Sequence, residues 1–300
     1  MERKCKKRRK VNNKSEWGGR KGKSCDNVPC DFFYNIPNSK LLTLMIVIAI
    51  VISVVLLIIF KKVIRYCEVE KDANETVSNY LSLVALPVGV VLAFIASSAW
   101  STFSDAQFKE NQEATQILVL YNAVRQIPGS EDVQQKIKDY LNLIVDVEFP
   151  LMQQGLQSQE GTTAIFEIGN MIYQMDIGDD TKNSIIYSQI IDVYEMVVEL
   201  RIARMTYVVD GLAPEMWWVL VLGVAVVIMV SFFVCSFSLC LQAVLTAFAV
   251  TALVSMLFLI IALNFPYRGD FGLDSLPFEI ALYQIGLEEA AAENDDDTDC

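Results

Sequence analysis

Residues 80–125 decide the fold of this chain, and they read YLSLVALPVGVVLAFIASSAWSTFSDAQFKENQEATQILVLYNAVR. The stretch carries no charged residue from 81 to 104 and then turns polar at Asp105, with no signal for a helix end between the two parts. About twenty apolar residues cross the hydrocarbon core of a bilayer. The stretch therefore predicts a membrane-spanning helix that continues into water.

One face of this predicted span changes from apolar to polar to charged along its length. Val91, Phe94, Ser98, Ser101 and Asp105 follow one another at steps of three and four residues, which places them on one side of a helix. A pore with a hydrophobic neck that widens into water has this order of side chains. The alternative is that Val91 and Phe94 face lipid while the three polar residues mark the exit from the membrane. The spacing alone leaves both interpretations open.

A second stripe on the same span consists of small residues at every fourth position. They are Ala85, Gly89, Ala93 and Ser97. Ridges of small side chains let the backbones of membrane helices approach closely, which is how helices associate in lipid. We predict that this face is used for helix packing.

Three long uncharged stretches account for the 53% of residues that are hydrophobic. They cover residues 41–60, 81–104 and 216–267, and the last is long enough for two crossings. The sequence predicts an all-α membrane protein with four transmembrane helices, at residues 41–60, 81–104, 216–237 and 240–263. A helical domain at residues 105–215 lies between the second and third spans, and an ending segment at residues 264–285 follows the fourth.

The charges are distributed unevenly. Residues 1–40 hold twelve Lys and Arg, whereas residues 286–300 hold seven acids and no base. The first segment is predicted to be a disordered basic tail that keeps the N-terminus inside, which puts both termini and residues 105–215 in the cytoplasm, with the plasma membrane as the expected residence. Residues 105–215 are strongly acidic, so nucleic acid is an unsuitable partner. The expected partners are the lipid bilayer, inorganic ions and further copies of the chain.

Apolar residues recur at helical spacing throughout residues 105–215. Ser130 is expected to cap one of these helices, and the helix is expected to close before Pro150. The chain contains no histidine, no phosphate-binding loop and no nucleophile-elbow motif. Acidic pairs such as Glu288 and Glu289 are interpreted as solvated tail charges. The sequence therefore predicts neither an enzyme nor a bound metal or cofactor.

The order of these elements, together with several short motifs, resembles the bestrophin-like (DUF4239) family of membrane proteins over residues 80–280. The matching residues are Glu113 with Tyr121, Tyr140 with Glu148, Arg201 with Arg204, Pro214 with Trp217, and Pro266 with Gly269. The chain departs from the family at Asn264 and Phe265, where an Asp and an Arg are usual. The resemblance implies a distant likeness to bestrophin anion channels, which are lined by their second helix.

Each matched residue also has a structural interpretation. Glu148, Arg201 and Arg204 are expected to form a buried ion-pair network rather than an ion-binding site. The segment from Pro266 to Gly269 is expected to end the fourth helix and anchor it at the interface.

The leading hypothesis is an oligomeric ion channel, anion-conducting if the resemblance extends that far, with the second span lining the pore. The alternative is a non-conducting membrane scaffold that binds a protein partner through its acidic cytoplasmic helices.

Overall fold

The computed structural model describes residues 37–64, 73–178, 181–234 and 238–296. Residues 1–36 of the basic tail, residues 235–237 between the third and fourth spans, and the last four residues of the acidic tail lie outside these ranges. All regular structure in the described ranges is helical. The elements are α2 (Asn38–Ile64), α3 (Ala73–Val124), α4 (Glu131–Leu143), the π-helical turn η1 (Ile144–Glu148), α5 (Phe149–Gln153), α6 (Gln159–Tyr173), α7 (Thr181–Val209), α8 (Pro214–Ser231), α9 (Leu239–Leu263) and α10 (Leu276–Asp296).

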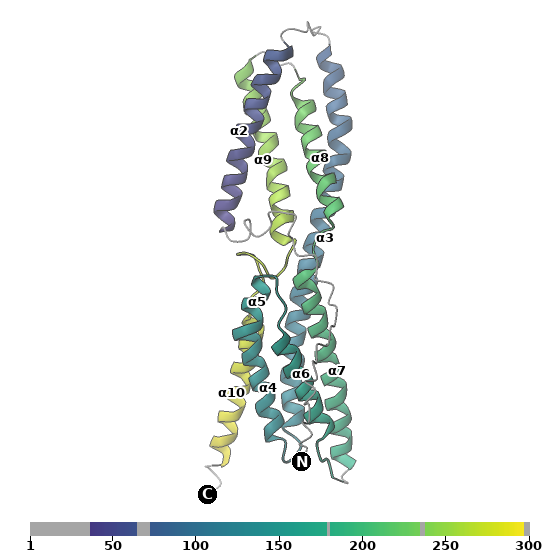
Figure 1. Ribbon diagram of the computed structural model, residues 1–300, viewed down its shortest axis with the longest axis vertical. Coiled ribbons are helices and arrows are strands. Elements are labelled where there is room, and N and C mark those ends of the chain that lie inside the picture. Colours follow the sequence, from purple (N-terminus) through teal and green to yellow (C-terminus); the bar gives the residue numbers. More distant parts are fainter. Residues whose placement is uncertain (1–36, 65–72, 179–180, 235–237, 297–300) are drawn as a thin grey trace, which may run out of the picture.

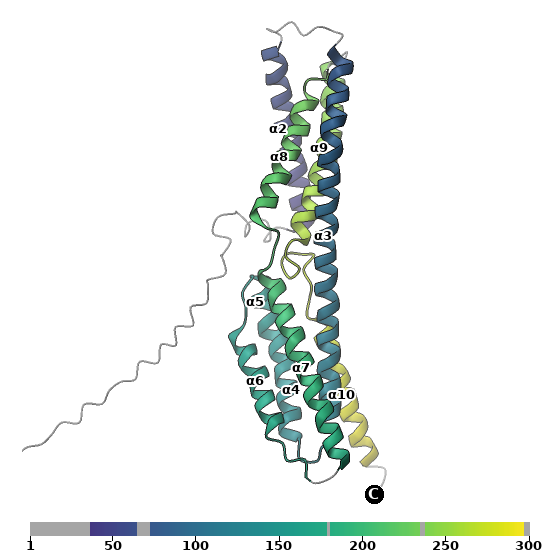
Figure 2. The same ribbon diagram turned by 90° about the vertical axis from the view of Figure 1, so that its right-hand side faces the viewer.

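The helices form two bundles that are stacked end to end (Figure 1). The first, the membrane bundle, contains α2, α8, α9 and the first half of α3. The second, the extramembrane domain, comprises residues 105–209 and 264–296, and it contains the second half of α3 with α4–α7 and α10. Figure 2 shows α3 running through both bundles, so this one helix joins them.

The membrane bundle exposes large apolar side chains over its outer surface. Four helices, α2, α3, α8 and α9, are long and apolar enough to cross a bilayer. Side chains such as Trp218 and Phe248 are more than 70% exposed. Hydrocarbon solvates such a surface, and helices satisfy their backbone hydrogen bonds internally, so the bundle is built for lipid. The chain is an all-α membrane protein with four transmembrane helices.

Helix α3 is much longer than a bilayer requires. Its 52 residues give a length of about 78 Å at 1.5 Å per residue, whereas the hydrocarbon core is about 30 Å thick. Only the uncharged half of α3 can lie in the bilayer, and the charged half from Asp105 onward belongs to the extramembrane domain. Pro87 lies inside this helix without ending it, as membrane helices tolerate.

The extramembrane domain has an extensive buried core. Tyr121, Ile137, Ile144, Met152 and Val197 are at most 1% exposed and belong to one apolar cluster drawn from α3, α4, η1, α5 and α7. The core also encloses charged side chains: Glu110, Glu113, Glu148, Arg201 and Arg204 are all at most 3% exposed. Buried charges are rare unless they are paired, so this domain is where a functional or architectural role for charge must be sought.

Two local expectations are not met in full in this domain. Ser130 occupies the N-cap position of α4, but its side chain caps no helix N–H; its hydroxyl instead donates to the Val124 carbonyl, 2.7 Å away. The helix does not close before Pro150 either, because the π-helical turn η1 continues α4 directly into α5. Pro150 occupies the first turn of α5, where its missing N–H is tolerated. The π-turn therefore removes the need for a break and carries Glu148 into the core.

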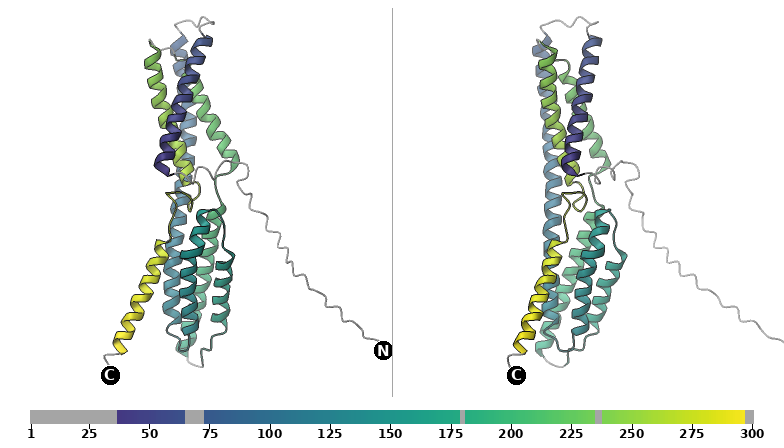
Figure 3. Two further views of the ribbon diagram at one scale, coloured as in Figure 1. Left: turned by 60° about the vertical axis from the view of Figure 1, so that its left-hand side comes forward. Right: turned by 90° about the vertical axis from the view of Figure 1, so that its left-hand side faces the viewer.

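The acidic tail predicted to begin at residue 286 begins inside a helix. Helix α10 continues to Asp296 and packs along α3 and α4 (Figure 3). Glu289 accepts hydrogen bonds from the Lys138 ammonium at 2.8 Å and from the Tyr121 hydroxyl at 2.6 Å. Glu289 keeps part of its exposure to solvent, with its side chain 40% exposed, but it is not a free tail charge, because two partners from other helices hold it.

Candidate functional site

The graded stripe of α3 lies on the surface of the subunit. Phe94 is 73% exposed and Val91 is 39% exposed, and Ser98, Ser101 and Asp105 are exposed as well. Packing within the chain uses a different face of the helix, formed by Leu92, Ile95 and Ala96. Apart from Asp105, which Tyr207 of α7 contacts, the stripe is not covered by any helix in the described part of the chain, so it faces lipid, water or another copy of the subunit.

The ridge of small residues is also left open by the other helices of the chain. Gly89, Ala93 and Ser97 are exposed and Ala85 is half-buried. A Cβ placed on Gly89 would meet no atom within 4 Å. At 100° per residue, the packed face of Leu92 and Ala96 lies between the ridge and the graded stripe. The helix packing predicted for the ridge is thus not made by the described helices of the same chain, and packing against another copy stays a prediction.

Asp105, the last residue of the graded stripe, is held by α7. The Tyr207 hydroxyl donates a hydrogen bond to Asp105 Oδ2. Burial, followed by this hydrogen bond, raises the pKa of Tyr207 to about 12. The phenol therefore stays a donor at physiological pH and fixes the carboxylate where the helix leaves the bilayer.

The second candidate feature is a charged network inside the extramembrane domain. Arg204 binds both oxygens of Glu113, with Nε at 2.6 Å from Oε2 and Nη2 at 2.9 Å from Oε1. The same guanidinium reaches Glu148 Oε2 at 2.9 Å, and Arg201 Nη2 lies 2.6 Å from Glu148 Oε1. The structure thus brings together the three residues expected to pair and adds Glu113 as a fourth.

Aromatic rings enclose the network. The guanidinium carbon of Arg204 lies 5.2 Å from the centre of the Phe278 ring and 5.8 Å from that of Phe149, and Arg201 lies 5.9 Å from the Tyr140 ring. Burial by itself would raise the pKa of Glu148, but Arg204 and Arg201 outweigh it and hold that pKa below its usual value. Each of the four residues takes part in an ion pair and the network is closed to solvent, which suits an architectural role better than ion binding.

Two local features place Glu148 in this network. The π-turn η1 ends at Glu148 and turns its side chain inward, where it is 0% exposed. Opposite, helix α6 begins at Ser158, whose hydroxyl accepts a hydrogen bond from the Gly161 N–H. A Cβ at Gly161 would overlap Glu148 Oε1, so only glycine allows this approach. Sequence reasoning missed Gly161, because nothing local marks a glycine that a distant carboxylate touches.

Glu110 was also missed, although the sequence carried a signal for it and for Glu113. Both lie in register with Ala106, Ala114 and Ile117 along the buried face of α3. Carboxylates within an apolar stripe are expensive to bury, so their presence there points to buried partners or to a neutral acid.

The segment after α9 connects the two bundles. Asn264 Oδ1 accepts a hydrogen bond from the Leu212 N–H at 2.6 Å, which links this segment to the α7–α8 connection. Arg268 lies 5.4 Å from the centre of the Phe265 ring and donates to the Gln154 carbonyl at 2.8 Å. Asn264 and Phe265, the two departures from the family pattern, therefore make contacts of their own without an Asp–Arg pair.

The segment from Pro266 to Gly269 fulfils only part of the role predicted for it. Gly269 ends the turn with φ of +76°, a conformation that favours glycine. Tyr267 is 1% exposed and packs against Phe149 in the extramembrane core. The segment therefore ends the fourth helix, but Tyr267 anchors it in protein rather than at the lipid interface.

Pro214 begins α8, and Trp217 packs against the core of the membrane bundle.

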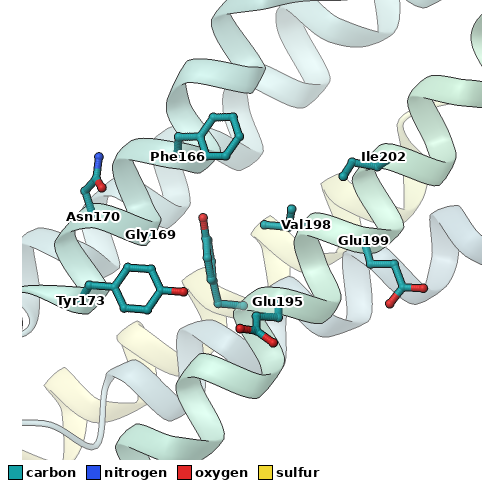
Figure 4. Close-up of a pocket in the computed structure, with 9 residues that line it drawn as sticks. Phe166, Gly169, Asn170, Tyr173, Glu195, Val198, Glu199 and Ile202 are labelled. Carbon is teal, nitrogen blue, oxygen red and sulfur yellow. The ribbon is translucent and has the colours of Figure 1, made fainter.

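A groove between α6 and α7 is the third candidate. It encloses about 500 Å³, and Figure 4 shows Phe166 and Tyr173 reaching from α6 toward α7. Glu195 and Glu199 line it on α7, and Ile202, which is 62% exposed, lies at one end. A second hollow of about 430 Å³ shares Phe166, Val198 and Ile202 with the first. The described residues contain no cluster of His, Cys, Asp and Glu suited to a metal ion.

These features define a class of protein: a four-span helical membrane protein whose second span extends into a domain held by buried ion pairs. The sequence model described as the Bestrophin-like domain matches residues 36–278. The chain therefore belongs to the bestrophin-like family.

Solved structures share the fold at low sequence identity. A bacterial bestrophin homologue from Klebsiella pneumoniae with a leucine-to-threonine mutation is 14% identical, with a TM-score of 0.62 over 81% of this chain and 96% of that chain. A membrane protein with a glycine-to-alanine mutation is 17% identical, with a TM-score of 0.59 over 80% of this chain and 95% of that chain. At these identities the likeness concerns the fold. No curated protein matches the sequence.

Proposed function

We propose that the protein is an oligomeric ion channel of the bestrophin type and that α3 lines its pore. One observation carries the proposal: in a chain of the bestrophin-like family, the graded stripe from Val91 to Asp105 is exposed, and only Asp105 is contacted by another described helix of its own subunit. Because the stripe lies on the outside of a single subunit, it can line a pore only if several copies of the subunit surround a common axis. Several α3 helices with this face inward enclose a channel that is narrow and apolar at Phe94 and wider and polar beyond it.

We propose that the bilayer of residence is the plasma membrane and that the extramembrane domain and both termini lie in the cytoplasm. The basic residues before α2 support this orientation. A C-terminal epitope should resist protease in intact cells and become accessible after permeabilisation. Cleavage in intact cells would reverse the assignment.

The primary test is ionic current from purified protein in planar bilayers, with Phe94→Ala as the informative variant. Leu86→Ala is the matched control, because Leu86 lies on the same helix at 74% exposure, against 73% for Phe94, but off the graded stripe. We expect the Phe94 variant to change single-channel conductance or open probability and the Leu86 variant to leave both unchanged. Equal effects of the two variants would remove α3 from the pore, and silence of the wild type at verified density would reject conduction.

We propose that the channel conducts anions, and Asp105 is the residue on the stripe that bears most directly on this selectivity. A carboxylate at the wide end of a pore repels anions, whereas the hydrogen bond from Tyr207 compensates part of its charge. Replacing chloride by gluconate should shift the reversal potential, and replacing potassium by a large organic cation should not. The opposite pattern establishes a cation channel, and Asp105→Asn should then reduce its cation selectivity.

The groove between α6 and α7 favours a second candidate function, a scaffold that binds a protein partner. Its apolar floor and its two glutamates suit a basic amphipathic segment. The test is a pull-down with the wild type and with Ile202→Asp, which places a charge at the exposed end of the groove. A stoichiometric partner that is lost in the variant, together with absence of current, would select the scaffold.

A further inference from the structure

Glu110 on α3 is a buried acid without a cation of its own. Its side chain is 2% exposed, and Oε2 has no hydrogen-bond partner among the described residues. The hydroxyl of Tyr267, which is 1% exposed, makes no hydrogen bond of good geometry in the described ranges, and it lies within the influence of the Glu110 carboxyl. Buried polar groups are nearly always hydrogen-bonded, so two such groups side by side need a physical reason.

The neighbouring charges show why Glu110 differs from the other two buried glutamates. Arg204 binds Glu113 through two contacts and Glu148 through one, and Arg201 is engaged with Glu148. Both guanidinium groups are thus committed, and ionised Glu110 would be a third buried negative charge against two positive ones. A charge in that position is costly, whereas a neutral carboxylic acid is not.

The groups that face Glu110 come from three elements. Burial is the main cause that raises its pKa to about 8; Glu113 and Asp274 add to the rise, while Arg204 and the Tyr267 hydroxyl oppose it. Asp274 and Tyr267 both belong to residues 264–275, which we call the junction segment. This segment connects α9 to α10 and is not helical, and its residues Tyr267 and Asp274 lie near Glu110.

We propose that Glu110 is a proton-controlled latch: while it carries a proton, the junction segment stays packed on α3, and loss of the proton releases it. The membrane bundle and the extramembrane domain are then coupled through residues 264–275 in a pH-dependent way. The proposal rests on the fold and not on ion conduction, so its test does not depend on whether the protein conducts ions.

The sign of the effect follows from the two states of the acid. In the packed state the pKa of Glu110 is about 8, and when the segment opens and water reaches the carboxyl it returns toward the ordinary value of 4.5. The packed state therefore holds a proton that the open state gives up. The stabilisation that protonated Glu110 gives to the packed state is fully present below about pH 4.5 and is lost as the pH rises toward 8. In this window the open fraction grows about tenfold per pH unit, and it levels off above pH 8.

The experiment is hydrogen exchange of the full-length protein in nanodiscs between pH 5.5 and 8.5, corrected for the intrinsic pH dependence of amide exchange. The reporters are the N–H groups of Arg268, Gly272 and Leu273, which are bonded within the junction segment to Phe265, Gly269 and Pro266. Amides inside α6 serve as the internal control. We expect opening of the junction segment to increase at least a hundredfold in the wild type between pH 5.5 and 8, while α6 amides change far less.

Variants assign the effect to one carboxyl. Glu110→Gln keeps the shape of the side chain and cannot ionise, so its junction amides should lose the pH dependence. Glu75→Gln, an exposed glutamate near the start of the same helix, should behave as the wild type. Opening that is independent of pH in the wild type overturns the proposal without any variant, and so does pH dependence that persists in Glu110→Gln.

Discussion

The membrane bundle and the extramembrane domain solve the packing problem in opposite ways. The membrane bundle has a small core around Leu92, Leu220 and Ile260 and leaves most of its apolar surface exposed. The extramembrane domain buries a large apolar core together with five ionisable residues. Lipid solvates apolar side chains, so shape rather than burial decides which faces of the membrane helices meet. Water penalises both exposed apolar groups and unpaired buried charges, so the second domain must satisfy every charge that it encloses.

The largest effect is expected from breaking the charged network. Glu148→Ala leaves Arg201 and part of Arg204 unpaired in a closed core, which should lower the free energy of unfolding by about 3–5 kcal/mol. Asp146→Ala, an exposed acid in the same π-turn, is the control and should change it by less than about 0.5 kcal/mol. Thermal unfolding in detergent measures both. An unchanged midpoint of thermal unfolding for Glu148→Ala would contradict the interpretation that the network stabilises the fold.

A smaller loss is expected at Gly161. The added methyl group of Gly161→Ala overlaps Glu148 Oε1 and lies 2.9 Å from Arg201 Nη2, so the network must shift. Overpacking of this kind costs about 1–3 kcal/mol. Gly286→Ala on α10, where a Cβ meets nothing within 4 Å, is the matched control. If both variants unfold at the same temperature, the close approach at Gly161 has no energetic weight.

The contacts of α10 should matter less than the buried pairs. Lys138→Ala removes a surface ion pair with Glu289, and such pairs contribute about 0–1 kcal/mol. The loss should shrink further in high salt, because the pair is partly exposed. Thermal unfolding at two salt concentrations checks this, and a loss as large as that of Glu148→Ala would contradict the division between surface and buried pairs.

The smallest effect on the subunit itself is expected in the membrane bundle. Gly89→Ala should change subunit stability by at most about 0.5 kcal/mol, because the new methyl group meets no atom of the chain. If the small-residue ridge packs against another copy, the same change should lower the fraction of oligomer in cross-linking or native mass measurements. Unchanged subunit and oligomer stability would remove the ridge from helix packing.

Sequence patterns predicted the helical class, the four spans and the continuity of α3, because the length and hydropathy of each span are local properties. They also predicted that Glu148, Arg201 and Arg204 belong together, through motifs whose order follows the family. They did not predict the π-turn at Ile144–Glu148, which replaced the expected helix end before Pro150. A π-turn changes the direction in which its side chains point. The direction needed here depends on the other helices that pack against the turn, so the local sequence does not reveal it.

The sequence by itself determined that this chain enters a membrane, which of its stretches cross it, and which side chains are too polar to remain there. Only the tertiary structure decided that Glu113 completes the ion-pair network, that Gly161 makes room for Glu148, and that Glu110 has no cation left to pair with. Crossing a bilayer depends on the composition of one segment. The pairing of buried charges depends on distances between segments that lie up to about ninety residues apart in the chain, such as Glu113 and Arg204 at a separation of 91.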